Sequence, residues 1–288
     1  KSFGDSLKFI FSLRPSDFLP VRPAVAEYTT GRTMGQDCEI MAARYEISRD
    51  QQDDFALRSH QLSGIAETKG YLKNEMCEVS LEPKFKVIKS DNGIRPNSKR
   101  KKLASLRTAF DKKHGTLTAA NSSFLTDGAA ASLIASESKA KELGLNPKSI
   151  IIDYAFTGQD LEDELLLGPA YAISKVLDKS GLSLDQMDVI ELHEAFAGQV
   201  LSNIKCLESD NFAKEKLGRE KAVGKIDMGK VNNWGGSLSI GHPFGATGSR
   251  LLTTASNRLQ IEGGKYALIA ACAAGAHGHA MIIKKYEV

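Results

Sequence analysis

Strand and helix patterns alternate along the second half of the chain, from about residue 148 onward. The apolar runs predict strands at 149–156, 187–192, 266–271 and 279–286. The amphipathic runs between them predict helices at 169–180, 195–207 and 246–260. Such alternation is typical of an α/β layered domain. The 288 residues are enough for about two domains.

The first half of the chain lacks this alternation of strand and helix patterns. Residues 34–68 predict two helices, and the second begins at Ser48 with Gln51 three residues on, as in a capping box. Residues 77–108 are polar and basic with several turn signals, which predicts a loop. A segment rich in small residues predicts a helix or strand running to about residue 134.

The first 30 residues are predicted to be irregular, because prolines interrupt an apolar patch. Three uses of this patch are open: packing within the protein, contact with a partner, or contact with a membrane surface. No apolar run approaches the ~18 residues that predict a transmembrane helix. The chain begins at Lys1 without a signal-peptide pattern, as in a processed form or a fragment.

Charge and cysteine content exclude some classes of protein. A net charge of +3 does not indicate nucleic-acid binding. The basic cluster Lys99–Lys102 is compatible with a solvated loop, an anion-attracting surface or a nuclear signal. The four cysteines contain no Cys-x-x-Cys pair, so a disulfide framework is not expected and a reducing compartment fits.

Three clusters of polar residues follow predicted strands or open a predicted helix, which is where α/β folds place their sites. The clusters are 193–196, 241–248 and 272–279. In the second, glycines flank His242, and a helix beginning near Thr247 would direct free N–H groups toward it. An imidazole there can donate to a developing oxyanion, although a structural histidine in a turn fits the spacing equally.

Cys272 ends an apolar strand and enters a turn of small residues. A buried inert thiol and a reactive cysteine both fit this position. A metal site formed with His277 and His279 would lack an evident fourth ligand. The motifs of phosphate loops, dinucleotide folds, serine-hydrolase elbows and zinc proteases are absent from the sequence.

Blocks of sequence along essentially the whole chain occur together in the order typical of one family. They are Ser48–Asp53 with Arg58–His60, Asp91–Pro96, Gly115–Ala131, His193–Phe196, Asn233–Gly236, Gly241–Gly248 and Cys272–Ala280. Each block alone is weak, but the ordered set is specific. The chain on this basis resembles the thiolases, acyltransferases that make and break carbon–carbon bonds in acyl-CoA thioesters.

The resemblance implies a fold and a division into domains. The expected fold is the C-terminal half of a thiolase-like layered αβαβα core, with an inserted, mostly helical loop domain. Residues 1–120 would form the CoA-binding loop domain and 121–147 a returning segment of the N-terminal core. Residues 148–288 would form the C-terminal core domain.

The resemblance also implies roles for four site residues. Cys272 matches the acid/base that handles the proton of the CoA sulfur or of the substrate α-carbon, a role for which a lowered pKa is expected. His242 matches the histidine that activates the nucleophile and stabilises the thioester oxyanion. His193 replaces the asparagine that holds a water in most members. The backbone N–H of Ala274 would belong to a second oxyanion hole.

Substrate-binding residues follow from the same resemblance. Ser123 and Phe196 match positions that line the pantetheine, while Arg58 and the loop near Arg95 match parts of the CoA-binding domain. The expected ligands are acyl-CoA and CoA as substrates, with no bound cofactor, no metal and no nucleic acid.

The histidine form of the 193–196 block is similar to that of a mitochondrial branch of the family. Those members are long-chain 3-ketoacyl-CoA thiolases of fatty-acid β-oxidation, and they yield acetyl-CoA and a shortened acyl-CoA. They work with an α subunit that carries hydratase and dehydrogenase activities, and they associate with the inner membrane. The resemblance therefore implies a homodimer formed through the core, this α-subunit partner, and peripheral membrane contact.

One departure concerns the nucleophile. In the family the nucleophilic cysteine belongs to the first half of the core, and this sequence begins near the loop domain. Neither Cys38 nor Cys77 lies in a strand-to-helix turn of small residues. We therefore expect a fragment, a truncated product or a chain that needs a partner, with an uncovered sheet edge.

Two other functions stay open from the sequence. The chain is compatible with a catalytically inactive CoA-binding or assembly module derived from a thiolase. A ketoacyl synthase shares a similar Gly-His-Pro block, but those enzymes generally lack a cysteine at the position of Cys272.

Overall fold

The structure, a computed structural model, describes residues 3–18 and 26–287. Its second half is built on four long or buried strands: β3 (Ser149–Gly158), β4 (Val189–Leu192), β5 (Tyr266–Ala273) and β6 (His277–Lys285). The helices among them are α6 (Gly168–Ser180), α7 (Ala197–Leu207), α8 (Asp210–Phe212), α9 (Ser237–Ile240) and α10 (Thr247–Ile261). All four predicted strands and all three predicted helices of this half are confirmed.

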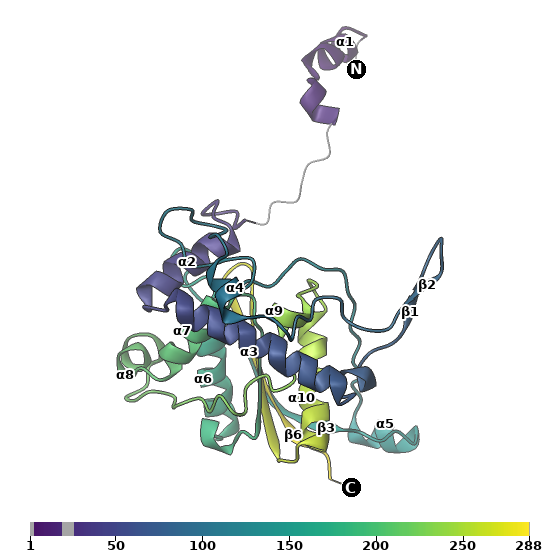
Figure 1. The fold of residues 1–288 in the computed structure, drawn as a ribbon, viewed down its shortest axis with the longest axis vertical. Coiled ribbons are helices and arrows are strands. Elements are labelled where there is room, and N and C mark those ends of the chain that lie inside the picture. The colour runs from purple at the N-terminus through teal and green to yellow at the C-terminus, as the bar shows by residue number, and fades with distance from the viewer. Residues whose placement is uncertain (1–2, 19–25, 288) are drawn as a thin grey trace.

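The four strands form one sheet in the order β3-β6-β5-β4. The pair β4–β5 is parallel, whereas β5–β6 and β6–β3 are antiparallel. Helix α6 packs against β3, β5 and β6, and α10 packs against β4, β5 and β6 (Figure 1). Because β4 and β5 are parallel neighbours, the segments that follow Leu192 and Ala273 leave the sheet at the same edge, the one formed by the C-terminal ends of these two strands.

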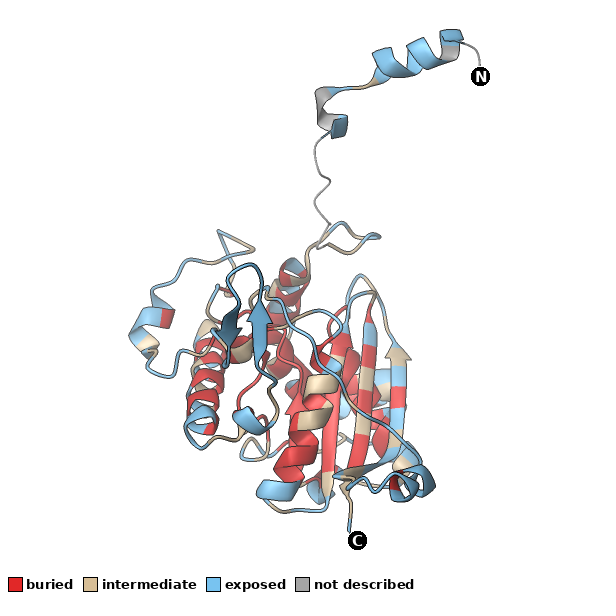
Figure 2. Cartoon of the chain, turned by 90° about the vertical axis from the view of Figure 1, so that its right-hand side faces the viewer, coloured by how far each residue is buried: buried red, intermediate tan, exposed pale blue. Residues whose placement is uncertain are grey.

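Side chains alternate between two apolar cores along each buried strand, as the period of two in a strand requires. On β5, Ala267 and Ile269 pack with α10, while Leu268, Ala270 and Cys272 belong to the larger core that contains α6 and α7. Figure 2 shows the resulting band of buried residues through the sheet and its helices. The α/β class and the layered core predicted from the sequence are confirmed.

Two helices of the first half cover α7. The helices of this half are α1 (Phe3–Ser12), α2 (Met34–Arg44), α3 (Arg49–Thr68), α4 (Arg100–Ala104) and α5 (Glu137–Glu142). Helices α2 and α3 both contact α7. The predicted capping box at Ser48 is present, since its side chain accepts from the Gln51 N–H and Gln51 accepts from the Ser48 N–H. The same device begins α2 at Thr33.

Two predictions for residues 77–136 are wrong. Residues 77–108 are not all loop, because they hold an exposed hairpin of β1 (Val79–Leu81) and β2 (Lys86–Ile88) and then α4. Local pairing across a tight turn gives no core periodicity, so the hairpin left no signal in the sequence. The predicted helix or strand ending near residue 134 is absent, and residues 123–136 have no regular structure. The side chains of Leu133 and Ile134 are exposed there, so packing does not impose a regular element.

Part of the first 30 residues is helical where an irregular chain was expected. Residues 3–12 form α1, and residues 15–18 form one 3₁₀ turn. The expectation for residues 19–25 lies outside the described residues. Figure 1 shows α1 apart from the body of the molecule. Its apolar side chains are exposed, so α1 does not pack into the core.

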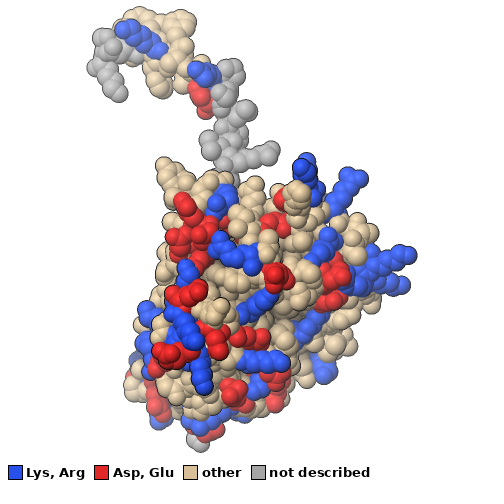
Figure 3. All heavy atoms as spheres, turned by 90° about the vertical axis from the view of Figure 1, so that its left-hand side faces the viewer, with Lys and Arg blue, Asp and Glu red and all other residues tan. Residues whose placement is uncertain are grey.

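The basic cluster lies on α4 and is partly neutralised. Arg100 forms ion pairs with Asp50, Asp53 and Asp54 of α3. On the face drawn in Figure 3, basic and acidic side chains are interspersed. Arg100 therefore docks α4 on α3, whereas Lys99, Lys101 and Lys102 are exposed to solvent. The segment is a short helix and not a loop, and the interpretations as an anion-attracting surface or a nuclear signal stay predictions.

None of the helices in the part of the chain that the structure describes is both long and apolar enough to cross a membrane.

Candidate active site

His193 directly follows β4 at the sheet edge. Its N–H donates to the Ala270 carbonyl on β5 at 2.8 Å, which extends the parallel ladder by one residue. The N–H of Leu192 donates to Oδ1 of Asn232 at 2.8 Å, and Asn232 Nδ2 donates back to the Leu192 carbonyl at 2.9 Å. These bonds hold the end of β4 rigidly, so the buried His193 ring has a fixed position.

His242 reaches the same place from the loop between α9 and α10. Gly241 before it has φ +96°, a conformation that L side chains rarely adopt, and a Cβ there would overlap Thr126. Helix α10 begins at Thr247, as the sequence predicted, and Thr247 Oγ1 lies 2.6 Å from His242 Nδ1. The His193 and His242 ring centroids are 4.1 Å apart at 41°. Two residues that are far apart in sequence thus form one pair of imidazoles.

Both imidazoles are neutral at physiological pH. Burial, followed by the positive charge of Arg250, lowers the pKa of His242 from 6.5 to about 4. Burial, then His242 and Arg250, lowers the pKa of His193 well below 6.5. A neutral imidazole offers one nitrogen as a donor and the other as an acceptor, so the pair can both accept a proton and donate a hydrogen bond.

Cys272 lies on β5, two residues beyond Ala270, at the sheet edge where His193 leaves β4. Its side chain is buried in the larger core. Burial raises the pKa of the Cys272 thiol to about 12, which is the opposite of the lowered pKa expected from its role. The thiol is therefore expected to keep its proton at neutral pH and to give it up only to a strong base. Ala274 lies in the exposed turn that follows, between β5 and β6.

Ser123 and Phe196 are brought together by backbone pairing. The Ser123 N–H donates to the Ala195 carbonyl at 2.9 Å, and Ser122 forms a β-bridge with Phe196. Phe196 is buried and meets Phe110 edge-on, with ring centroids 5.8 Å apart. The segment that begins at Asn121 thus pairs, over residues 121–123, with residues 195–197, which follow His193.

A hollow of about 320 Å³ opens beside this segment. It is lined by Leu125, Thr126, Asp127, His242 and Phe244. His242 is therefore the residue of the imidazole pair that faces an open space.

Arg58 and Arg95 lie outside this cluster. Arg58 donates to the carbonyls of Met228 and Val231, both at 2.7 Å, so its guanidinium is bound to the protein itself. Arg95 is exposed, and its N–H donates to His60 Nδ1 at 3.2 Å. Their predicted contact with CoA stays a prediction.

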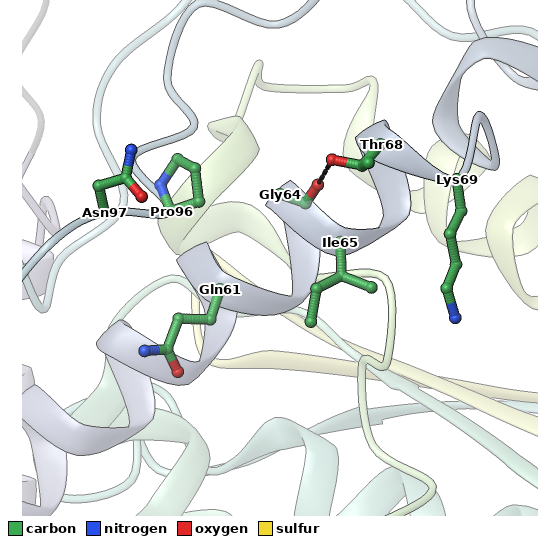
Figure 4. A pocket seen from close by; sticks show the side chains of 7 residues that line it. All are labelled: Gln61, Gly64, Ile65, Thr68, Lys69, Pro96 and Asn97. Atoms are coloured by element: carbon green, nitrogen blue, oxygen red, sulfur yellow. Dashed lines mark hydrogen bonds between the residues drawn. The ribbon is translucent and has the colours of Figure 1, made fainter.

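A second hollow, of about 550 Å³, borders the loop that carries Arg95 (Figure 4). It is lined by Gln61, Gly64, Ile65, Thr68, Lys69, Pro96 and Asn97. The first four belong to α3, Lys69 is the C-cap of that helix, and the last two directly follow Arg95. This hollow contains none of the site residues named from the sequence.

A buried polar network under the site was not found from the sequence. Glu194 accepts from Asn232 Nδ2 at 2.7 Å, from Ser59 Oγ at 2.8 Å and from the Leu238 N–H at 3.2 Å. Burial raises the pKa of the Glu194 carboxyl. The network ties α3 and α9 to the end of β4. Its partners lie up to 135 residues apart, so no local spacing could indicate them.

Within the described residues, no three His, Cys, Asp or Glu side chains are grouped so as to hold a metal ion. His277 and His279, the ligands considered for a site with Cys272, belong to β6, and the His279 ring packs on Phe156 at 4.6 Å.

Comparison with known proteins gives consistent matches along the chain. The family model for the thiolase N-terminal domain matches residues 16–138, and that for the thiolase C-terminal domain matches residues 145–285. The mitochondrial trifunctional enzyme subunit beta of Homo sapiens is 50% identical over 286 residues, covering 99% of this chain and 60% of that protein. A 3-ketoacyl-CoA thiolase of Yersinia enterocolitica is 49% identical, covering 99% of this chain and 65% of that protein.

Solved structures agree with these matches. A crystal structure of human mitochondrial 3-ketoacyl-CoA thiolase superposes with a TM-score of 0.78 at 31% identity, covering 91% of this chain and 62% of that one. A structure of human mitochondrial 3-ketoacyl-CoA thiolase in complex with CoA gives the same TM-score at 33% identity, covering 91% of this chain and 61% of that one. The chain spans about 60% of the length of the first curated relatives. It belongs to the thiolase family.

Proposed function

We propose that the complete enzyme cleaves 3-ketoacyl-CoA with CoA, giving acetyl-CoA and a chain-shortened acyl-CoA in fatty-acid β-oxidation. The observation that carries this proposal is the neutral imidazole pair of His193 and His242 at the sheet edge that also holds Cys272. The named relatives with this activity support it, because the chain aligns with them over almost all of its length.

The chemistry divides among these groups as follows. A nucleophilic cysteine, which we place outside these 288 residues, attacks the 3-keto carbon, and the C2–C3 bond breaks to leave the acyl group on sulfur. The departing acetyl-CoA carbanion takes the proton of the Cys272 thiol, whose raised pKa keeps that proton available. Neutral His242 is the base for the nucleophile. The Cys272 thiolate then takes the proton of the CoA thiol, whose sulfur attacks the acyl carbon. The bond between that carbon and the nucleophilic cysteine breaks, and protonated His242 returns its proton to the cysteine sulfur.

Hydrogen bonds to the substrate oxygens complete the proposal. His193 and His242 would serve the oxyanion at the thioester, and the N–H of Ala274 would serve the second oxyanion hole. We propose that Ser123 and Phe196 line the pantetheine, and that Arg58 and the Arg95 loop belong to the CoA-binding domain. CoA and acyl-CoA act as substrates, and no bound cofactor enters the reaction.

Replacing Cys272 with Ala in the full-length enzyme tests the assignment. We expect turnover to be lost, because the carbanion loses the thiol that the proposal assigns to it as proton donor. Cys206→Ala is the matched control, since Cys206 is also buried but lies on α7 away from the imidazole pair. A Cys272→Ala enzyme that turns over at the wild-type rate would end the assignment.

We propose as the alternative a CoA-binding or assembly module without catalytic activity. Thiolysis of a long-chain 3-ketoacyl-CoA by the purified chain, with intact-mass detection of the protein, separates the two. An acylated cysteine supports an enzyme complete in these residues. No adduct and no turnover, together with measurable CoA binding, supports the module.

We propose partners and an organisation from the relatives. The chain divides into a loop domain at 1–120, a returning segment at 121–147 and a C-terminal core at 148–288. It forms a homodimer through the core and binds an α subunit with hydratase and dehydrogenase activities in the mitochondrial matrix. Analytical ultracentrifugation, alone and with that subunit, measures both associations, and sedimentation as a monomer in both cases would contradict them.

Peripheral contact with the inner membrane is supported by α1. It exposes a set of large apolar side chains with the turn that follows it: Phe3, Leu7, Phe9, Ile10, Phe11 and Phe18. A helix of this kind can bury its apolar side chains at a lipid surface. Deleting residues 1–18 should abolish co-sedimentation with anionic phospholipid vesicles, and retained binding would contradict the proposal.

A further inference from the structure

Three side chains form a row that ends at the imidazole pair: Arg250, Ser237 and His193. Arg250 of α10 donates from Nη2 to Ser237 Oγ of α9 at 3.3 Å, and Ser237 Oγ lies 3.1 Å from His193 Nδ1. Ser237 and His193 are both buried. Arg250 and Ser237 lie outside the sequence blocks that carry the family resemblance.

The donors and acceptors in this row can be assigned from chemistry alone. A guanidinium has only donors, so the Ser237 oxygen must accept from Arg250. Ser237 then has one hydroxyl hydrogen, and its remaining side-chain partner in the described residues is His193 Nδ1. If Nδ1 carried the hydrogen instead, the hydroxyl hydrogen would be buried without an acceptor, which costs free energy. The favoured arrangement therefore has Nδ1 as acceptor.

We propose that Arg250 and Ser237 are positioning residues that hold His193 as the neutral tautomer with its hydrogen on Nε2. The Ser237 hydroxyl donates to Nδ1, the acceptor nitrogen of the ring, so Nε2–H stays free as its donor. Under the proposed function, on which this last step rests, that donor is the one that His193 offers to a water or to the substrate oxyanion. Arg250 and Ser237 thereby determine the hydrogen-bonding role of His193 without touching the substrate themselves.

The charges around the His193 ring favour its neutral form. His193 faces His242 from the loop before α10 and Arg250 from α10 itself, and both disfavour a second proton, which would make the ring a cation. Arg250 Nε and Nη1 are buried without a hydrogen-bond partner in the described structure, so its charge is not neutralised by a direct ion pair. Its charge is also felt by four carboxyls of the surrounding elements: Glu75, Asp91, Glu191 and Glu194.

The tautomer can be read directly by two-dimensional nitrogen NMR of the full 288-residue chain labelled with ¹⁵N-histidine. His193→Asn assigns the His193 signals among the six histidines. We expect wild-type His193 at pH 7 to show an unprotonated Nδ1 and a protonated Nε2. Ser237→Ala should produce signals averaged between the two tautomers, because the donor to Nδ1 is gone, and Ser237→Thr should restore the wild-type pattern.

Arg250 is tested in the same way. Arg250→Met removes both the charge and the N–H that orients Ser237, so the tautomers should mix, whereas Arg250→Lys should retain the pattern. Ser239→Ala is the matched control: Ser239 is buried on the same short helix but bonds to Ser59 and Ser63 and not to a histidine. A protonated Nδ1 in the wild type, or an unchanged pattern in a folded Ser237→Ala protein, would overturn the proposal.

Activity provides a second readout that separates this inference from the proposed function. In the full-length enzyme, Ser237→Ala should lower kcat about tenfold with little change in KM, as for an interaction made chiefly in the transition state, and Ser237→Thr should recover it. If Ser237→Ala shifts the tautomer but the wild-type enzyme shows no thiolysis, the positioning row stands and the proposed function fails. If thiolysis is present and Ser237→Ala changes neither kcat nor the tautomer, the row fails alone.

Discussion

At the scale of residues, the site combines groups whose protonation is set by burial. His242 is the clearest case, because its pKa falls to about 4 in the folded chain against 6.5 in the unfolded chain. As pH falls through this window, the unfolded chain binds a proton that the folded chain does not, so folding becomes less favourable. This contribution is fully present above pH 6.5 and is lost by about pH 4.

Replacing His242 with Gln should therefore flatten the dependence of stability on pH. We expect the free energy of unfolding of His242→Gln to fall less than that of the wild type between pH 6.5 and pH 4, as measured by urea unfolding. His114→Gln serves as control, since His114 is exposed and lies outside the site. Parallel curves for wild type and His242→Gln would contradict the lowered pKa.

Cysteine reactivity should divide sharply between one residue and the other three. Cys77 is exposed, while Cys38, Cys206 and Cys272 are buried, and burial raises the pKa of each buried thiol. Iodoacetamide at pH 7.5 should therefore modify Cys77 of the native chain at least about tenfold faster than the other three. Peptide mapping by mass spectrometry measures this, with urea-unfolded chain as the control in which all four react. Rapid native modification of Cys272 would show that its thiol is more accessible and more acidic than the structure indicates.

Part of the site could be predicted from the sequence and part could not. His193, His242 and Cys272 follow strands or open a helix, so the α/β pattern alone indicates that they approach one sheet edge. The bond between His193 and Ser237 spans 44 residues, and that between Ser59 and Glu194 spans 135, so only the folded chain brings these partners together. The raised pKa of Cys272 depends on its burial, which no motif specifies.

At the scale of elements, the start of α3 depends on one serine. Ser48→Ala removes the acceptor for the Gln51 N–H and breaks the capping box, so we expect a loss of about 1 kcal/mol in the free energy of unfolding. Chemical denaturation measures it. Ser136→Ala, at the cap of the exposed six-residue α5, should change stability by less than about 0.5 kcal/mol. Equal losses in the two variants would mean that α3 is not held by its cap.

The contact between α6 and β6 depends on a pair of glycines. A Cβ on Gly278 would overlap the backbone of Gly168 at the start of α6, and backbone cannot move aside as a flexible side chain can. Gly278→Ala should therefore destabilise the protein by about 1–3 kcal/mol, measured by thermal or urea unfolding. Gly248→Ala on α10, where a Cβ would meet open space, should be neutral or stabilising. A neutral Gly278→Ala would show that α6 is free to shift.

Elements were predictable where burial imposed a period on the sequence. The four strands of the sheet and helices α6, α7 and α10 were found from their patterns, whereas the short helices α8 and α9 were not. The hairpin of β1 and β2 exposes all six of its strand residues, and α4 is only five residues long, so neither carries a readable period. Helix α1 was missed because nearby prolines suggested an irregular chain, although none lies inside it.

At the scale of the whole molecule, α1 and the turn after it contribute little to folding. Their large apolar side chains are exposed, so removing residues 1–18 should leave the melting temperature within about 2 °C of the full chain. Differential scanning calorimetry of both chains measures this. A markedly larger fall would mean that α1 packs on the body of the protein in solution.

The connectivity of the sheet has a consequence for the order in which the chain folds. Strands β5 and β6 are joined by a turn of three residues, so their pairing closes only a small loop, whereas β4 reaches its parallel partner β5 only after residues 193–265 have been brought back. Contacts that close long loops have the larger entropic cost and form later. The loop between β3 and its partner β6, residues 159–276, is longer still. We therefore expect refolding followed by pulsed hydrogen exchange to protect β5 and β6 first, β4 later and β3 last. The imidazole pair would then be assembled only once β4 joins the hairpin of β5 and β6, and a chain stalled before that step would have no site.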